Sequence, residues 1–395
     1  MTPRLRLHAP DEIRSAAHGR NAAGQRALGP APDSDRPLRV LCYTPPSALQ
    51  NPGGGEVQLQ KTAEHLRQLG IDAKPLDPWT DRVEDADWLH IFGMQPECLK
   101  MAQAAARAGV SIALSPIAWH DPAATWHLER GLVRKLRGVA GYSVRRLFHA
   151  VPSWRRDLIH MSDLVLPNSR AEAQQLRILF NADPARIAVI PNGVDERFAA
   201  GDPRLFADRF GVGNFVLVPG RIEPRKNQLT VIEALWGAGV DTVVLGDAHV
   251  GHRDYYDACR RAADAGVTFV GHIAHDSPLL ASAYAAARVV VLASWFETPG
   301  LAALEGALAG SEVVVTEFGS TREYFGDLAR YVRPDDPAAI RDAVRAAITT
   351  PIGSRLSQHV RDRYLWQSTA QTTLRAYQQA TPVPRPVTDV PAAAA

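Results

Sequence analysis

Short apolar runs that alternate with helical patterns, twice over, constrain the fold of this chain more than any other feature. In the first half they predict strands near residues 39–43, 87–92, 111–117, 164–166 and 187–190. In the second half they predict strands near residues 215–218, 242–245, 268–270, 289–292 and 312–315. Such βα alternation predicts parallel sheets with helices on both faces. With 395 residues, the chain is long enough for two α/β domains of this kind.

The alternation and the composition together predict six segments. They are a flexible extension over residues 1–37, a first α/β domain over 38–195, a linker over 196–213, a second domain over 214–356, a helix over 357–380 and a flexible tail over 381–395. The extension is rich in Ala, Arg, Pro and Gly and has no helical or strand period, which is typical of disorder. The tail is rich in Pro and Ala.

Composition favours a cytoplasmic globular protein. Hydrophobic residues make up 46% and charged residues 22% of the chain, and the net charge is only +2. The longest apolar runs are shorter than the ~18 residues of a membrane helix. The arginine-rich start has no apolar core, so we expect no secretory signal. Cys42, Cys98 and Cys259 show no paired spacing, which argues against a disulfide framework or a zinc site.

Two glutamates eight positions apart, Glu297 and Glu305, bracket a Pro-Gly-Leu turn. An apolar run over residues 289–293 predicts a buried strand before them, and a leucine stripe at helical spacing follows. Gly300 lets the backbone approach a ligand, and free N–H groups at the helix start would face an anion. Two carboxylates around a phosphate-sized hole suit a nucleotide sugar. The alternative is two surface glutamates on an ordinary helix.

A basic loop precedes this turn by about seventy residues. The apolar run 215–219 predicts a strand, and a loop with three cations in six residues, Arg221, Arg225 and Lys226, follows it. Open α/β sheets bind ligands where such loops leave the carboxyl ends of strands. Arginine offers a bidentate fork for phosphate oxygens and lysine a point charge. The alternative is a solvated basic loop without a ligand.

A glycine-rich turn, Gly53, Gly54 and Gly55, follows the first predicted strand and opens a helix predicted over residues 56–69. Its spacing is not Gly-x-Gly-x-x-Gly, so a dehydrogenase is disfavoured. Its position after a strand predicts close approach of the backbone to a ligand, and the alternative is a turn without one.

Together these motifs resemble family 4 of the retaining glycosyltransferases (glycosyl transferases group 1). The resemblance rests on residues 220–228, on Pro-Asn-Gly-Val-Asp at 191–195 and on residues 297–305, and it covers most of residues 38–380. It implies the GT-B fold, which has two doubly wound parallel-sheet, Rossmann-like domains facing a cleft. The first domain would be on the acceptor side and the second would bind the donor. It also implies that the helix over 357–380 crosses back to the first domain.

The resemblance implies a role for each candidate residue. Arg221 and Lys226 would hold the donor diphosphate, while Glu297 would contact the transferred sugar and its developing charge. Glu305 would bind the ribose. His120, after the predicted strand 111–117, would lie near the reacting sugar, the alternative being a structural histidine at a strand end. The other donor-binding candidates are Gly300, Leu301, Gly53, Gly54, Gly55 and Asn192.

The expected activity is transfer of a hexose from a nucleotide sugar to a glycan or lipid-linked acceptor, in surface polysaccharide or lipopolysaccharide assembly. The resemblance implies retention, with the leaving phosphate helping to deprotonate the acceptor. Because Arg221 and Lys226 can stabilise that phosphate, we expect no metal and no other cofactor. Asp85 and Asp87 resemble an Asp-x-Asp metal motif but lead directly into a predicted buried strand. Two alternatives are a nucleotide-sugar epimerase and a non-catalytic GT-B-like binding protein.

A basic segment over residues 130–156 carries eight cations and no acid, with apolar residues between them. Such a stretch indicates a membrane surface contact or a site for an anionic acceptor. The alternative is a solvated helix that packs its apolar side inward. Nucleic acid is disfavoured because no aromatic stacking platform accompanies the cations. We hypothesise that the segment docks the enzyme peripherally on the inner membrane, beside a lipid-linked glycan.

Overall fold

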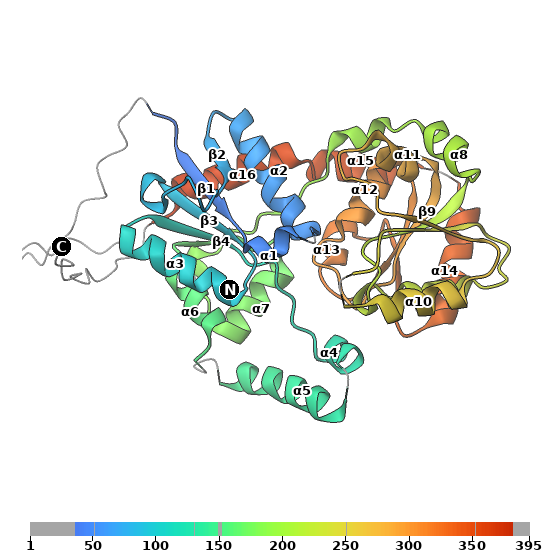
Figure 1. The fold of residues 1–395 in the computed structure, drawn as a ribbon, viewed down its shortest axis with the longest axis horizontal. Coiled ribbons are helices and arrows are strands. Elements are labelled where there is room, and N and C mark those ends of the chain that lie inside the picture. Colours follow the sequence, from blue (N-terminus) through green and yellow to red (C-terminus); the bar gives the residue numbers. More distant parts are fainter. Residues whose placement is uncertain are drawn as a thin grey trace, which may run out of the picture. The chain divides into compact units, whose positions relative to one another are not determined.

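The structure is a computed structural model that describes residues 36–50, 52–129, 131–148, 152–249, 251–351 and 353–381. The predicted extension, apart from its last two residues, and nearly all of the predicted tail lie outside these residues. Within the described part, the chain forms two parallel sheets with helices on both faces, which confirms the predicted fold class (Figure 1). No helix of this part is both long enough and apolar enough to span a bilayer.

The first sheet has the strand order β2-β1-β3-β4-β5, with every neighbouring pair parallel. Its strands are β1 (Arg39–Tyr43), β2 (Asp72–Pro75), β3 (Trp88–Phe92), β4 (Ser111–Ser115) and β5 (Leu164–Val165). The helical segments that follow these strands are α1 (Pro46–Leu49), α2 (Gly54–Gln68), η1 (Val83–Asp85), α3 (Pro96–Ala108), α4 (Pro122–Leu128), α5 (Leu132–Leu147), α6 (Trp154–Met161), α7 (Arg170–Phe180) and η2 (Pro184–Arg186).

Both faces of the first sheet are buried, which explains why its central strands are mostly apolar. On β1, Val40 and Cys42 point into a cluster shared with α2 and with the C-terminal helix α16 (Trp366–Gln379). Leu41, between them, points into a cluster shared with α3, α6 and α7. The alternation of successive side chains across a strand therefore fills two separate cores.

The second sheet has the order β11-β10-β9-β6-β7-β8, again parallel. Its strands are β6 (Phe215–Pro219), β7 (Thr242–Leu245), β8 (Val267–Gly271), β9 (Ala287–Leu292), β10 (Glu312–Thr316) and β11 (Arg330–Val332). Its helical segments are η3 (Glu196–Ala200), α8 (Pro203–Phe210), η4 (Pro224–Lys226), α9 (Gln228–Leu235), α10 (Arg253–Ala262), α11 (Pro278–Ala286), α12 (Leu301–Ala309), α13 (Thr321–Phe325), α14 (Pro337–Thr349) and α15 (Arg355–Arg363).

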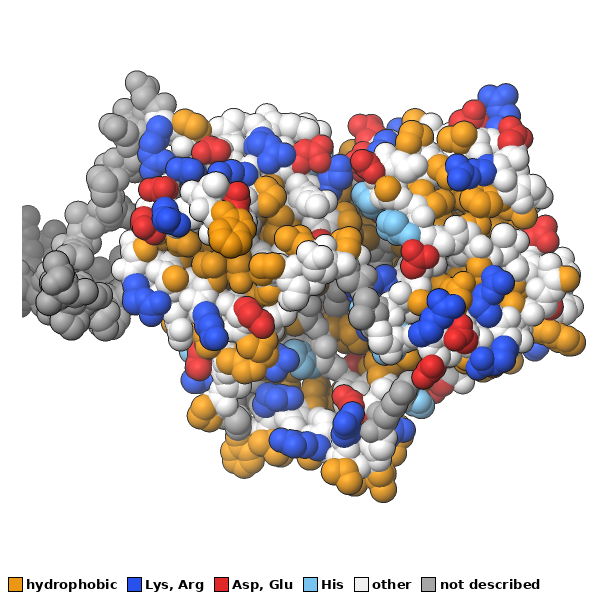
Figure 2. Space-filling model, viewed as in Figure 1, with side chains coloured by type: hydrophobic (Ala, Val, Ile, Leu, Met, Phe, Trp, Pro, Cys, Tyr) orange, Lys and Arg blue, Asp and Glu red, His pale blue; other side chains and the backbone are white. Residues whose placement is uncertain are grey.

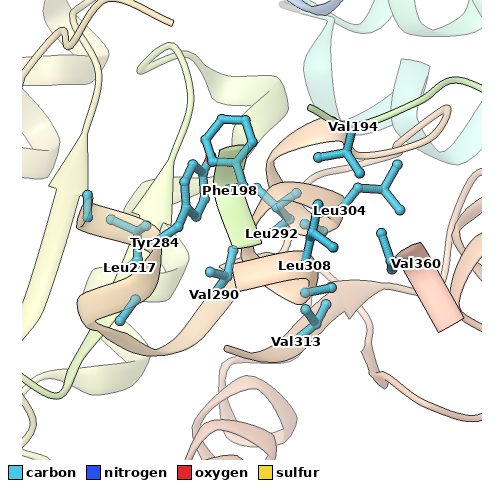
Figure 3. Close-up of a cluster of buried hydrophobic side chains, with 14 of the residues drawn as sticks. Val194, Phe198, Leu217, Tyr284, Val290, Leu292, Leu304, Leu308, Val313 and Val360 are labelled. Atoms are coloured by element: carbon cyan, nitrogen blue, oxygen red, sulfur yellow. The ribbon is translucent and has the colours of Figure 1, made fainter. Parts of the chain in front are cut away.

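One core of the second sheet lies under α8, α11, α12 and α15. Figure 3 shows Leu292 of β9 beside Leu304 and Leu308 of α12, and Leu217 of β6 near Tyr284 of α11, all in this core. The other core lies under α9, α10 and α14. Residues 196–213, which the sequence predicted as a linker, form η3 and α8 and bury aromatic side chains in the first of these cores.

Three secondary-structure predictions differ from the structure. The strand predicted over residues 187–190 is not formed as a regular strand: Ile187 makes an isolated bridge to Val165, and only the N–H groups of Ala188 and Ile190 donate to the chain beside them, at Val165 and Pro167. Strands β2 and β11 were not predicted. Both are at sheet edges and are only partly buried, so their sequences lack an apolar run. The helix predicted over 357–380 is interrupted after Arg363, giving α15 and α16.

Helix α16 packs on α2 of the first sheet, although the chain reaches it from the second sheet. Its Tyr377 hydroxyl lies 2.7 Å from Nδ1 of the buried His90 on β3. The Tyr377 ring also stacks on Trp88, with the ring centroids 5.0 Å apart. These contacts fasten the end of the described chain to the first sheet.

Candidate active site

The glycine-rich turn of the first sheet lies against the basic loop of the second. Gly53 caps α2, and its N–H donates to Glu56 Oε2 at 2.7 Å. A Cβ atom on Gly53 would lie 3.2 Å from the guanidinium carbon of Arg221, and one on Gly54 would lie 3.4 Å from Leu301 Cδ1. The absence of side chains therefore allows the two loops to approach each other closely.

A cavity of about 770 Å³ opens at this junction. That volume is within the range of small-molecule sites, which is roughly 300–1,000 Å³. Its walls come from loops of both sheets. Loops at the carboxyl ends of parallel strands are where such sheets bind ligands. The lining residues that matter below are Gly53, Gly54, Gly55, His120, Arg155, Arg221, His249 and Phe296.

Lys226 and Glu297 form a buried ion pair beside the basic loop. Lys226 Nζ lies 2.6 Å from Glu297 Oε1, and the Ser294 hydroxyl donates to the same oxygen at 2.7 Å. Burial alone would raise the pKa of Glu297, but the Lys226 and Arg225 charges and these hydrogen bonds hold it below its usual value. Glu297 is therefore ionised at neutral pH.

The backbone of Glu297 is fixed by a close contact with the chain after β10. Glu297 N–H donates to the Phe318 carbonyl at 3.2 Å, and Ser320 N–H donates to the Glu297 carbonyl at 2.9 Å. Gly319, between them, has φ +103°, and a Cβ there would lie 1.9 Å from the Glu297 carbonyl oxygen. Only glycine fits this position, so Gly319 sets where Glu297 lies.

Glu305 is held within the second sheet by a histidine. It lies on α12, which begins after Gly300 in the left-handed conformation, and its side chain is 9% exposed. Glu305 Oε1 lies 2.9 Å from His275 Nε2, and Arg197 donates to the His275 carbonyl. This carboxylate is thus oriented, with little contact to solvent.

His120 follows β4 and is positioned through its backbone. Its N–H donates to Gln175 Oε1 at 2.9 Å, and Gln175 Nε2 donates to its carbonyl at 3.0 Å. Burial, followed by the charges of Arg155 and Arg145, lowers the pKa of His120 to about 4. The imidazole is therefore neutral at pH 7, with one donor and one acceptor nitrogen.

The loop before His120 rests on a buried carboxyl group. Glu172, at the start of α7, accepts hydrogen bonds from Ala118 N–H and Asn168 N–H, both at 2.7 Å. Burial raises the pKa of Glu172 to about 7, although these two hydrogen bonds oppose the shift. This group supports the cavity wall but does not line the cavity.

Asn192 lies where the two sheets meet. Its Nδ2 donates to Gln58 Oε1 at 3.1 Å, and its N–H donates to the Tyr324 hydroxyl at 3.0 Å. That hydroxyl donates to the Asn168 carbonyl at 2.7 Å. Asn192 is only 2% exposed, so in this conformation it connects α2 to α13.

The structure thus brings five predicted site residues to one cavity: Gly53, Gly54, Gly55, His120 and Arg221. The other six candidates are not among its lining residues: Lys226, Glu297, Gly300, Leu301, Glu305 and Asn192. Sequence reasoning did not single out Phe296, His249 or Arg155 as lining residues. The basic segment was the only signal for Arg155.

One cluster among the described residues has the composition of a metal site. Single ligand atoms of Glu223, His249 and His252 lie within 4.8 Å of one another. However, Arg225 donates to Glu223 Oε1 at 3.0 Å, and Arg221 approaches the same oxygen at 3.9 Å. These two cations disfavour a further cation at the carboxylate. The Asp-x-Asp residue Asp87 instead accepts a hydrogen bond from the Arg39 N–H at 2.8 Å.

Two family models match this chain. The model described as Glycosyltransferase Family 4 covers residues 52–198, and the model described as Glycosyl transferases group 1 covers residues 213–350. A D-inositol 3-phosphate glycosyltransferase of Kribbella flavida is 32% identical over 247 residues, which are 57% of this chain and 58% of that protein. A glycogen synthase of Mycobacterium tuberculosis is 31% identical over 252 residues, which are 60% of this chain and 58% of that protein. The chain thus spans less than two thirds of either relative.

Solved structures share the fold. Anabaena HepE in complex with UDP and glucose has a TM-score of 0.64 at 20% identity, and the match covers 87% of this chain and all of that one. Sucrose-phosphate synthase of Thermosynechococcus elongatus has a TM-score of 0.68 at 16% identity, covering 87% and 99%. The two sheets, their connections and the two family matches lead to one assignment: the chain belongs to the glycosyltransferases of family 4, glycosyl transferases group 1, and has their GT-B fold.

Proposed function

We propose that the protein transfers a hexose from a nucleotide sugar to a glycan or lipid-linked acceptor, with retention and without a metal ion. The observation that carries this proposal is the cavity where Gly53–Gly55 of the first sheet meet Arg221 of the second. Backbone groups of a glycine turn and a guanidinium suit a diphosphate between two sheets. The curated relatives named as glycosyltransferases, and the HepE structure with UDP and glucose, support a sugar nucleotide as the donor.

The charged and polar residues of the two cavity walls have different proposed roles in the reaction. Arg221 and Lys226 stabilise the negative charge that develops on the leaving diphosphate. Such electrostatic stabilisation is the largest catalytic term in many enzymes. Glu297, kept ionised by Lys226, stabilises positive charge at the sugar, and Glu305 accepts hydrogen bonds from ribose hydroxyls. His120, neutral at pH 7, contacts a sugar hydroxyl from the opposite wall. The leaving phosphate takes the acceptor proton.

Gly300, Leu301 and Asn192 complete the proposed donor site. Gly300 has φ +80° and opens α12, so the N–H groups at the start of this helix, including that of Leu301, are oriented to meet a phosphate oxygen. Asn192 connects the two sheets, and its Oδ1 is buried without a hydrogen-bond partner in the described structure. We therefore place Asn192 at the edge of the donor site.

Turnover distinguishes this proposal from its alternatives. Purified protein with EDTA is incubated with GDP-, UDP-, ADP- and dTDP-hexoses, and the nucleotide and the sugar anomer are followed by NMR. We expect slow release of one nucleoside diphosphate, with the sugar released in the donor's anomeric configuration. Conversion of the donor to an epimeric nucleotide sugar would instead indicate an epimerase. A requirement for added metal would contradict the metal-free chemistry, and no turnover of any donor would favour the non-catalytic alternative.

We also propose that α5 docks the cytoplasmic enzyme on an anionic membrane, in surface polysaccharide or lipopolysaccharide assembly. The helix buries none of its residues. Leu132, Val133, Leu136 and Leu147 are between 53% and 79% exposed and lie along one stripe of the helix, with cations beside and opposite it. Figure 2 shows hydrophobic and Lys or Arg side chains gathered together where Figure 1 draws α5. Such a helix fits the surface of an anionic bilayer.

Vesicle co-sedimentation tests the membrane contact. Replacing Leu132, Leu136 and Leu147 with Gln removes the apolar stripe and leaves the charge unchanged. We expect this triple variant to lose most of its binding to anionic vesicles, while Leu205→Gln, an exposed leucine on α8, binds as the wild type does. Equal binding of the wild type to anionic and neutral vesicles would refute the contact.

A further inference from the structure

Two arginines of the basic segment lie next to His120 without an acidic partner. Arg145 is on α5 and Arg155 on α6, and both are partly buried. Neither forms an ion pair with a carboxylate among the described residues. Burial and the charge of Arg145 lower the pKa of Arg155, and no acid opposes this shift. Two cations held close together without a counter-charge are unfavourable unless an anion binds between them.

These arginines line two neighbouring cavities. Arg155 lines the large cavity with His120, and Arg145 lines a smaller cavity of about 190 Å³. Trp119, His120 and Phe296 line both, so the two spaces adjoin at the loop after β4. The arginines therefore flank His120 on the first-sheet side of the site.

Two hydrogen-bond donors without an acceptor belong to residues that line the smaller cavity. Trp119 Nε1 and Arg145 Nε are buried and have no hydrogen-bond partner in the described structure. A buried donor without an acceptor is destabilising, so native proteins rarely leave two together. Donors from an indole and a guanidinium require acceptor oxygens, which phosphate and carboxylate groups provide.

The acids near this place are otherwise engaged or exposed. Asp121 lines the smaller cavity, but its Oδ1 accepts from Ala123 N–H at 2.7 Å and Ala124 N–H at 3.1 Å as the cap of α4. Glu129 also lines it and is exposed to solvent. Glu56 lines the large cavity and is partly buried, but its Oε2 accepts from the Gly53 N–H at 2.7 Å. None of these three carboxylates forms an ion pair with either arginine.

We propose that Arg145, Arg155 and the Trp119 indole bind an anionic group, a phosphate or a carboxylate, on the acceptor. The inference rests on the proposed transfer reaction and specifies its acceptor. An acceptor anchored there has its hydroxyl groups near His120, facing the donor sugar that Arg221 and Lys226 hold by its diphosphate. The site thus has one anion-binding region on each wall, and the acceptor region selects anionic over neutral acceptors.

Calorimetric titration with glucose 6-phosphate, glucuronate and glucose tests the proposal. We expect the wild type to bind one of the two anionic sugars at least ten times more tightly than glucose. Arg145→Gln/Arg155→Gln abolishes this preference. Arg146→Gln, which changes the exposed neighbour on α5, preserves it. Arg221→Gln preserves it too, because that residue serves the donor.

The proposal would be overturned if the double variant kept the preference for an anionic sugar over glucose, or if Arg221→Gln alone lost it. Equal binding of all three sugars by the wild type, or no binding of any of them, would also overturn it. Vesicles containing phosphatidylinositol identify the source of the anion: binding only to these, and only with both arginines present, indicates a lipid headgroup rather than a soluble sugar. Thermal unfolding verifies the fold, and Arg155→Gln alone replaces the double variant if the latter does not fold. Donor binding is measured on the same samples, so its absence with the anion preference intact would refute the transferase and not this site.

Discussion

Breaking the Lys226–Glu297 pair would measure how strongly these two buried charges stabilise each other. The two charged atoms are 2.6 Å apart, and the side chains are 16% and 7% exposed. With an effective dielectric constant of about 20, their attraction is on the order of 6 kcal/mol. Desolvation of both ions offsets much of this, so the pair itself adds little net stability.

Removing one partner lowers the free energy of unfolding by more than the net stabilisation that the intact pair provides. Glu297→Gln leaves the Lys226 ammonium buried beside Arg225, and breaking such pairs costs about 3–5 kcal/mol. We expect a loss of about 3 kcal/mol, because Gln keeps the hydrogen bond from Ser294. Lys226→Met should cost about 2 kcal/mol, since Glu297 retains Ser294 and the Arg225 charge.

The double variant distinguishes coupling from independent effects. Without either charge, no unpaired ion remains, so we expect Lys226→Met/Glu297→Gln to lose about 2 kcal/mol rather than the sum of about 5. Urea unfolding at pH 7, followed by circular dichroism for the four proteins, measures the coupling energy. Losses that add to within about 0.5 kcal/mol would refute the pair as a coupled unit.

The same pair predicts a pH dependence. The folded pKa of Glu297 is below its value of 4.5 in the unfolded chain. Its contribution is therefore complete above pH 4.5 and is lost as the pH falls through the lowered pKa. The wild type should lose its advantage over Glu297→Gln only below pH 4.5. An unchanged difference at pH 3 would contradict the assignment.

Three further predictions concern the scaffold. Tyr377→Phe removes the hydroxyl from the buried His90 and should lower the free energy of unfolding by about 1–3 kcal/mol in urea titrations; a neutral effect would show that this contact does not fasten α16. Burial lowers the pKa of His90 to about 3 and of His120 to about 4, so their contribution to the free energy of unfolding is complete above pH 6.5 and declines as the pH falls toward these values. Because the raised pKa of Glu172 acts in the opposite direction, the test uses Glu172→Gln, whose free energy of unfolding should be lower at pH 4.5 than at pH 7; equal values would contradict the two histidine shifts. Gly319→Ala should destabilise by at least about 2 kcal/mol because its Cβ meets the Glu297 carbonyl, whereas Gly53→Ala, which meets only the movable end of Arg221, should change thermal stability little; the reverse order would refute the geometry.

The sequence was sufficient to predict the central strands and the loops that follow them. Strands buried on both faces, such as β6 and β9, are built on apolar runs. Such runs are typical of buried parallel strands, so they could be recognised in the sequence. Loops at the carboxyl ends of parallel strands meet at one edge, so Gly53 and His120 could be placed at the same edge of the first sheet. That Arg221 of the second sheet faces them was implied only by the resemblance to family 4. Edge strands β2 and β11 carry no comparable apolar signal.

Sequence patterns did not predict which side chains pair when they are far apart along the chain. Lys226 meets Glu297 across 71 positions, and Glu305 meets His275 across 30. These pairs are set by packing between separate βα units, which no local spacing encodes. Likewise, the basic segment indicated positive charge but not that Arg145 and Arg155 turn toward His120 while the leucines of α5 face solvent.

The most direct test of the central claim is donor binding by both walls without metal. Calorimetric titration of the wild type with nucleotide sugars in EDTA, beside Arg221→Gln and the exposed control Arg204→Gln, measures it. We expect one nucleotide sugar to bind the wild type and the control equally. Arg221→Gln should bind it roughly 10- to 100-fold more weakly, which corresponds to the loss of one charge-assisted hydrogen bond. Equal binding by all three proteins, or binding only after a divalent ion is added, would contradict it.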